Sequence, residues 1–178
     1  MSNQTNINAS EERQTTAAIA LGSNLGESLT TLENALQTLS ETIGITLTSH
    51  SSWYKTKPVG GPPQPDYVNG CALVKVNLDP HKLLETILGI EQKFGRVRKE
   101  HWGARTLDLD LILYDDLILD TPDLQIPHPR MRERAFVLIP LAEIAPNWIE
   151  PVSGKKIIQL RDEIDCSGVV QVETQKQC

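Results

Sequence analysis

The sequence predicts an α+β fold with a ferredoxin-like βαββαβ core, in which two helices pack on one face of an antiparallel sheet. Two segments with apolar residues at helical spacing each follow a short strand-like segment, and two more strand-like segments complete the order. The length of 178 residues, with 39% hydrophobic and 22% charged residues, is that of one soluble globular domain.

The first strand and helix lie near the N-terminus. Residues 17–21, AAIAL, indicate a buried strand, and the turn GSNLG follows. Apolar residues then recur at helical spacing, which predicts a helix of about a dozen residues with Ser28 as its N-cap. The residues in this stripe are Leu29, Leu32, Ala35, Leu36 and Leu39.

The remaining elements alternate in the same way. Residues 45–55 partly alternate polar and apolar side chains, as a half-exposed strand does, and GGPPQP then excludes a helix or a central strand. Residues 71–78, CALVKVNL, form the next predicted strand, after which Asp79 and Pro80 begin a second helix that Gly95 ends. The strand RTLDLDLILYDD completes the core, and a further apolar stretch, FVLIPLAEI, follows it.

Composition limits the domain organisation and the class of protein. We expect a disordered N-terminal tail over residues 1–16, a single domain over residues 17–168 and a loose C-terminal tail over residues 169–178. A net charge of −6 argues against a protein that coats nucleic acid or anionic membranes. The three cysteines form no C-x-x-C pair, which argues against a zinc site or disulfide framework and favours a reducing, cytoplasmic setting.

Two aspartates interrupt the most apolar strand. Asp108 and Asp110 are two residues apart, so they point to the same face, while Leu107, Leu109, Leu111 and Leu113 should point to the core. Ile112 and Tyr114 should continue the aspartate face. A solvated sheet face would tolerate the pair, but two like charges on one face repel each other, and carboxylates at this spacing suit Mg²⁺.

Arginines gather on both sides of that strand. KFGRVRKEHWGAR, residues 93–105, carries five of the seventeen Lys and Arg residues, and PRMRER adds Arg130, Arg132 and Arg134. A solvated basic loop is the ordinary interpretation of such a segment, but next to an aspartate pair the arginines predict a site for a Mg²⁺-bound di- or triphosphate. GSNLG matches neither the P-loop nor G-x-G-x-x-G, so a tight connection and an anion-binding turn both stay open.

Several aromatic residues lie close to these segments in the sequence. Trp53 and Tyr54 precede the proline-rich segment, Tyr67 follows it, and Trp102 lies among the arginines. Each could belong to the core, but together with a polar neighbour such as Asn69 they could also hold a flat heteroaromatic substrate.

Four segments, in order, resemble the 6-hydroxymethyl-7,8-dihydropterin pyrophosphokinase family of folate synthesis. They are GSNLG, SSWYKTKPVG with QPDYVNG, EQKFGRVRKEHWGARTLDLDLILY, and IPHPRMRERAFVLIPLAEIAP, within about residues 17–160. The resemblance implies a three-layer α-β-α fold and a monomer with two Mg²⁺ ions. It also implies transfer of pyrophosphate from ATP to the hydroxymethyl group of the dihydropterin, with release of AMP.

The resemblance also implies roles for individual residues. Asp108 and Asp110 would bind both metal ions, and Arg96 and Arg105 would stabilise the charge that passes between donor and acceptor. The residues implied for ATP are Glu91, Arg96, Arg98, Arg105, Leu111, His128 and Arg134. Those implied for the pterin are Thr56, Val59, Tyr67, Asn69, Trp102 and Phe136.

The sequence departs from the family pattern at a few positions. His101 replaces a usual Arg in a loop that is one residue shorter, and Lys57 replaces a common Pro. Asp123 and Gln125 stand where an Arg and a Thr are found in the bacterial form. A nucleic-acid-binding module with a ferredoxin-like sheet and a regulatory nucleotide-binding domain without turnover are the rival interpretations; the acidic charge counts against the first and the retained Asp and Arg residues against the second.

Overall fold

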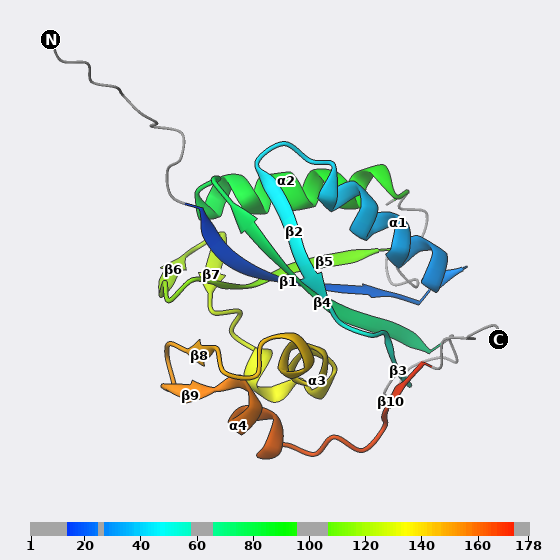
Figure 1. The fold of residues 1–178 in the computed structure, drawn as a ribbon, viewed down its shortest axis with the longest axis vertical. Helices are drawn as coiled ribbons and strands as arrows, with labels where there is room; N and C mark the ends of the chain where they lie inside the picture. The colour runs from blue at the N-terminus through cyan, green and yellow to red at the C-terminus, as the bar shows by residue number, and fades with distance from the viewer. Residues whose placement is uncertain (1–13, 25–26, 58–65, 96–106, 173–178) are drawn as a thin grey trace, which may run out of the picture.

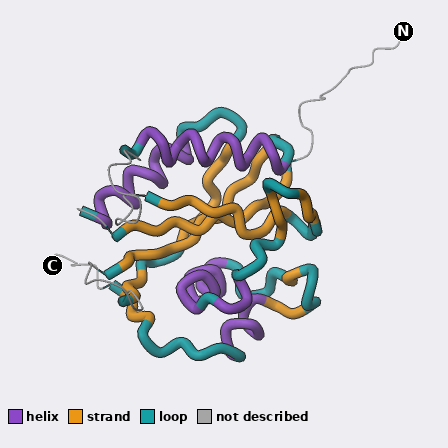
Figure 2. The backbone as a smooth tube through the Cα atoms, turned by 180° about the vertical axis from the view of Figure 1, so that it is seen from behind, coloured by secondary structure: helices purple, strands orange, loops and turns teal. Residues whose placement is uncertain are grey.

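The computed structural model describes residues 14–24, 27–57, 66–95 and 107–172. Helices α1 and α2 cover one face of the central sheet, and α3 and α4 cover the other (Figures 1 and 2). The predicted three-layer α+β fold is therefore confirmed. In chain order the elements are β1 (Thr15–Ser23), α1 (Ser28–Ser40), β2 (Ile45–His50), β3 (Tyr54–Thr56), β4 (Tyr67–Val76), α2 (Pro80–Lys93), β5 (Asp108–Tyr114), β6 (Leu119–Thr121), β7 (Leu124–Ile126), η2 (Met131–Glu133), α3 (Ala135–Ile144), β8 (Ile149–Glu150), β9 (Lys155–Lys156), α4 (Ile157–Asp162) and β10 (Val169–Gln171).

The central sheet is antiparallel, in the order β10-β3-β4-β1-β5, and β2 pairs with β4 beside β3. The single strand expected over residues 45–55 is thus two strands. Between them, Ser51 still bonds to β4: its backbone N–H donates to the carbonyl oxygen of Cys71 at 2.9 Å, and its hydroxyl accepts the backbone N–H of Cys71 at 2.9 Å. Gly70 makes room for the ring of Trp53 there, since a Cβ on Gly70 would lie 2.6 Å from that ring.

The sheet separates two apolar cores. Ala17, Ile19 and Leu21 on β1 face the first core with α1 and α2, whereas Ala18 between them faces the second core with α3 and α4. This alternation follows from the two-residue period of a strand. FVLIPLAEI forms α3, and its residues Val137, Leu138, Leu141 and Ala142 are buried in the second core.

A register shift in β5 corrects one expectation about its faces. Ala18 pairs with Leu113 and Ile19 with Leu111, so Ile112 is an extra residue in β5. Beyond such a bulge the side chains exchange faces. Leu113 therefore joins the second core rather than the core of Leu109 and Leu111, and Tyr114 packs against the first core instead of continuing the aspartate face.

The ends of two elements also differ from the prediction. Ser28 is not the N-cap of α1; the cap is Glu27, without a side-chain hydrogen bond to the helix, because Ser28 is already helical and its hydroxyl accepts from Ser23. The C-terminal segment is not a loose tail over residues 169–171, which form β10 because they complete the hydrogen bonds of β3. No helix in the described ranges has the length and apolar character that a membrane crossing needs.

Candidate active site

Two cavities meet at the aspartate pair of β5. The larger cavity, of about 970 Å³, lies on the α3 side of the sheet. The smaller, of about 370 Å³, lies between α2 and β7. Asp108 and Asp110 line both cavities, so ligands in the two cavities would meet at these carboxylates.

The two aspartates share a face of β5, as predicted. Both are half-buried, while Leu107, Leu109 and Leu111 around them are buried in the first core. The carboxyl group of Glu91 on α2 accepts a hydrogen bond from the backbone N–H of Leu109 at 2.6 Å. This bond, made in a buried position between the two aspartates, fixes the strand that carries them against α2.

The floor of the larger cavity is a row of residues across the sheet. Asp108 pairs with Gly22, and Gly22 pairs with Asn69, so Asp108 and Asn69 lie on one face, two strand spacings or roughly 10 Å apart. A Cβ on Gly22 would lie 2.7 Å from Oδ1 of Asn69, so any larger residue at this position would force this amide to shift. The amide nitrogen of Asn69 donates to the hydroxyl of Thr56 at 3.3 Å.

His128 lies at the smaller cavity, between Asp110 and two arginines. Burial lowers the pKa of His128; Asp110 opposes this, and the charges of Arg134 and Arg130 add to it. Its Nδ1 accepts the backbone N–H of Arg130 at 3.2 Å, so in the neutral ring the hydrogen is on Nε2. His128 is thus an uncharged hydrogen-bond donor at neutral pH.

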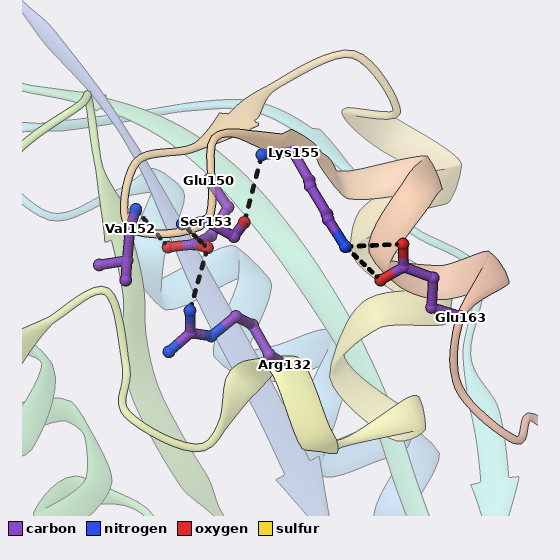
Figure 3. A network of polar contacts seen from close by, with 6 residues as sticks. All are labelled: Arg132, Glu150, Val152, Ser153, Lys155 and Glu163. Atoms are coloured by element: carbon purple, nitrogen blue, oxygen red, sulfur yellow. Dashed lines mark hydrogen bonds and ion pairs between the residues drawn. The ribbon is translucent and has the colours of Figure 1, made fainter.

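The three arginines of PRMRER do not act as one cluster. The guanidinium group of Arg134 lies 5.5 Å from the ring centroid of Phe136, and both residues line the larger cavity. Arg132 instead pairs with the buried carboxylate of Glu150 at 3.7 Å, on the hairpin of β8 and β9 (Figure 3). Arg132 is thus engaged away from the larger cavity, whereas Arg134 lines that cavity.

The structure brings together most of the predicted residues that it describes. Thr56, Tyr67, Asn69, Arg134 and Phe136 line the larger cavity, and Glu91, Leu111 and His128 line the smaller one. Five predicted residues lie outside the described ranges: Val59, Arg96, Arg98, Trp102 and Arg105. His101 lies outside them as well.

It was not predicted from the sequence that small residues of β1 and residues near the C-terminus line the larger cavity. Ala20 and Gly22 line the larger cavity, as do residues 167–170. The alternation of small residues on β1 was a usable signal, because small side chains on one sheet face leave room for a ligand. Nothing in the sequence of residues 167–170 indicates that they would reach the site.

Comparison with known proteins identifies the family. The model of the family described as 7,8-dihydro-6-hydroxymethylpterin-pyrophosphokinase (HPPK) matches residues 18–146. The chain belongs to the HPPK family. A 2-amino-4-hydroxy-6-hydroxymethyldihydropteridine pyrophosphokinase of Synechocystis is 54% identical over 153 residues, covering 86% of this chain and 78% of the relative. A relative with the same description from Haemophilus influenzae is 47% identical, covering 78% of this chain and 86% of the relative. One from Bacillus subtilis is 46% identical, covering 72% of this chain and 77% of the relative.

Solved structures show the same fold as this HPPK family member. The HPPK-DHPS of Plasmodium falciparum, wild type with pterin and p-hydroxybenzoate, matches with a TM-score of 0.68 at 15% identity, covering 87% of this chain and 44% of that chain. An HPPK-DHPS in complex with substrates matches with a TM-score of 0.66 at 14% identity, covering 84% of this chain and 43% of that chain. This chain thus spans less than half the length of those chains, and at such identity the likeness shows the fold alone.

Proposed function

We propose that this protein transfers the pyrophosphoryl group of ATP to the hydroxymethyl group of 6-hydroxymethyl-7,8-dihydropterin, giving the pterin pyrophosphate and AMP, in folate biosynthesis. Membership of the HPPK family supports this reaction. The observation that carries it is the pair Asp108 and Asp110 at the junction of two cavities, where a donor and an acceptor can meet.

The larger cavity suits the dihydropterin. A flat, polar heterocycle needs apolar faces and a few fixed hydrogen-bond partners at its edge. Tyr67 and Phe136 offer aromatic faces, and the amide of Asn69, held by Thr56, offers a donor and an acceptor. With the ring over Gly22 and Asn69, the hydroxymethyl group would extend toward Asp108 along the cross-strand row.

The smaller cavity suits the nucleoside of ATP. Leu84, Leu111 and Leu124 supply apolar surface, and the phosphates would lie at the junction with the larger cavity. His128 would donate a hydrogen bond to a phosphate oxygen rather than a charge, since its pKa lies below the ordinary value of 6.5. We propose Arg134, which lines the larger cavity, for the phosphates at the junction, and Arg96, Arg98 and Arg105 from the segment outside the described residues.

The aspartate pair fits Mg²⁺. Within the described ranges no group of three or more His, Cys, Asp and Glu residues gathers as a complete protein metal site would. Two carboxylates that leave the other ligand positions to waters and phosphate oxygens are the donor set that Mg²⁺ prefers. Bound Mg²⁺, for which we propose two ions, would neutralise phosphate charge and orient the triphosphate.

The protein itself contributes mainly position and electrostatics. The hydroxymethyl oxygen would attack the β-phosphorus in line with the bond from that phosphorus to the oxygen that bridges it to the α-phosphorus. This P–O bond breaks, the bridging oxygen leaves with AMP, and the hydroxyl proton passes to solvent. No covalent protein nucleophile is required, and the arginines and His128 would stabilise charge on the transferred group. A monomeric state and a cytoplasmic location stay predictions.

Incubation with Mg-ATP and 6-hydroxymethyl-7,8-dihydropterin, with chromatography of the nucleotides, tests the proposal. We expect AMP and pterin pyrophosphate in equal amounts, with loss of both when EDTA is added. Asp110→Asn should lower turnover by at least about a hundredfold, whereas Asp116→Asn, at an exposed turn position after β5, should leave it unchanged. ADP as the nucleotide product, or ATP binding without turnover, would contradict the proposal.

A further inference from the structure

The C-terminal segment forms part of the wall of the larger cavity. Residues Ser167, Gly168, Val169 and Val170 line this cavity together with Asn69 and Asp108. The family match ends at residue 146, so it attributes no role to these residues. These residues nevertheless lie next to the proposed dihydropterin subsite.

Pairing with β10 completes the hydrogen bonding of β3. β3 contains three residues and lies between β4 and β10 in the sheet (Figure 1). The backbone N–H of Val172 donates to the carbonyl oxygen of Trp53 at 2.8 Å. Because hydrogen-bonded pairs alternate in an antiparallel ladder, Val170 and Lys55 form the next such pair, and the N–H of Gln171 points away from β3.

The register of β10 connects it to the substrate-facing residues. Val169 pairs with Thr56, and Thr56 pairs with Tyr67, so these three side chains share one face of the sheet. The hydroxyl of Thr56 accepts the hydrogen bond from the amide of Asn69. The position of β10 is thus transmitted through Thr56 to Asn69, which lies against Gly22 at the cavity floor.

A fixed turn leads the chain into β10. The carboxylate of Asp165 accepts hydrogen bonds from the backbone N–H of Ser167 at 2.9 Å and from its hydroxyl at 2.7 Å. Gly168 then adopts a φ of +90°, a conformation that other residues rarely adopt. These contacts direct the chain from α4 to the open edge of β3.

We propose that β10 is a positioning element of the dihydropterin subsite. Its pairing with β3 holds Thr56 and Asn69 at the substrate, and Val169 forms the apolar wall beside them. This inference rests on the proposed function. It means that the residues of β10, which lie beyond the end of the family match, help to determine the affinity for the dihydropterin. Without β10, β3 would be a three-residue edge strand with one open side, and Thr56 would lose its restraint from that side.

Two proline variants separate the pairing from general effects of proline. Val170→Pro removes a backbone N–H that pairs with β3. It removes little side-chain packing, since Val170 is 64% exposed. Gln171→Pro is the matched control, because its N–H does not point toward β3. Binding of the dihydropterin is measured by calorimetry in the presence of Mg²⁺ and α,β-methylene ATP, which cannot release AMP. We expect about a tenfold rise or more in its Kd for Val170→Pro, a nearly unchanged Kd for the ATP analogue, and wild-type values for Gln171→Pro.

A second variant keeps the test decisive if Val170→Pro does not fold. Val169→Phe keeps the backbone pairing and narrows the cavity, so it should also weaken binding of the dihydropterin but not of the analogue. The inference is overturned if either folded variant, judged by its thermal midpoint, binds both ligands as the wild type does, or if both ligands weaken equally. Wild-type protein that binds no dihydropterin would overturn the proposed function as well, which distinguishes the two failures.

Discussion

A single missing side chain shapes the floor of the candidate site. Gly22 lies between Asp108 and Asn69 in the cross-strand row, and the carbonyl oxygen of the Asn69 amide occupies the space that a Cβ would need. Gly22 therefore sets both the depth of the cavity and the orientation of Asn69. The role of this glycine comes from the close approach of the Asn69 side chain, not from a turn.

Gly22→Ala should weaken dihydropterin binding. The added Cβ would meet Oδ1 of Asn69 at 2.7 Å and displace the amide, which also breaks its hydrogen bond to Thr56. We expect the KM for the dihydropterin to rise about tenfold, the effect of roughly one neutral hydrogen bond, with a smaller change in the KM for ATP.

Gly89→Ala is the matched control. Gly89 lies in α2, and a Cβ there would meet nothing within 4 Å. We expect unchanged kinetics and a gain in stability of about 1 kcal/mol from the better helix former. Equal kinetics for both alanine variants would contradict the role given to Gly22.

At the level of single residues, the sequence predicts the aspartate pair within one strand better than it predicts side-chain contacts between elements. Asp108 and Asp110 were predictable because carboxylates are unusual in an apolar strand and because the strand period fixes their common face. The contact of Gly22 with Asn69 was not predictable, since it depends on the register between β1 and β4. The same holds for the separation of Arg132 from Arg134, because the buried partner of Arg132, Glu150, lies sixteen residues beyond Arg134 in the chain.

The helices differ in how their first turns are stabilised. Asp79 caps α2, with its side chain accepting the backbone N–H of Lys82 at 2.8 Å and Pro80 at the first helical position, as the sequence predicts. Glu27 at the start of α1 makes no such bond. The two helices therefore provide a comparison within one molecule.

Asp79→Ala should lower the free energy of unfolding by about 1 kcal/mol, the usual cost of losing an N-cap. Glu27→Ala should change it by much less, because that residue makes no side-chain cap bond. Urea denaturation of both variants gives the measurement. A loss for Glu27→Ala as large as that for Asp79→Ala would contradict the difference between the two caps.

At the level of elements, helical spacing predicted α1 and α2, since each turns one apolar face toward the first core, and short apolar runs predicted β1 and β4, which contribute to both cores. This reasoning failed where the chain departs from a regular period. The extra residue Ile112 exchanges the faces of Leu113 and Tyr114, and a bulge has no signature in this sequence. β10 escaped prediction because three exposed or half-buried residues become a strand only through pairing with β3.

The molecule as a whole depends on polar links outside the site. The buried carboxylate of Glu150 accepts the backbone N–H groups of Val152 and Ser153 and pairs with Arg132, which joins the hairpin of β8 and β9 to η2 (Figure 3). Burial by itself raises the pKa of Glu150. The hydrogen bonds from Ser153 and Val152 and the charge of Arg132 outweigh it and hold the pKa below the ordinary value of 4.5.

Glu150→Gln should lower the free energy of unfolding at pH 7 by about 1–3 kcal/mol, since charge-assisted hydrogen bonds to a buried group are lost. Because the folded-state pKa is lowered, ionised Glu150 stabilises the fold above about pH 4.5, and this contribution is lost as the pH falls through the folded-state pKa. The difference between wild type and variant should therefore shrink between pH 5 and pH 3, where denaturation curves measure it.

Glu163→Gln serves as the surface control for Glu150→Gln. Glu163 pairs with Lys155 at 2.8 Å, but both side chains are about half exposed. Such a pair contributes about 1 kcal/mol at most. A loss as large as that of Glu150→Gln would show that burial does not distinguish the two carboxylates.

The central claim is that the two phosphoryl groups beyond the α-phosphate of ATP move together to the dihydropterin, next to Asp108 and Asp110. The most direct measurement uses ATP labelled at the β-phosphorus, with the products separated after incubation with 6-hydroxymethyl-7,8-dihydropterin and Mg²⁺. The β-label should be found in the pterin product and none of it in the nucleotide product. A β-label that remains in the nucleotide would mean transfer of the γ-phosphoryl group alone, and would contradict the claim.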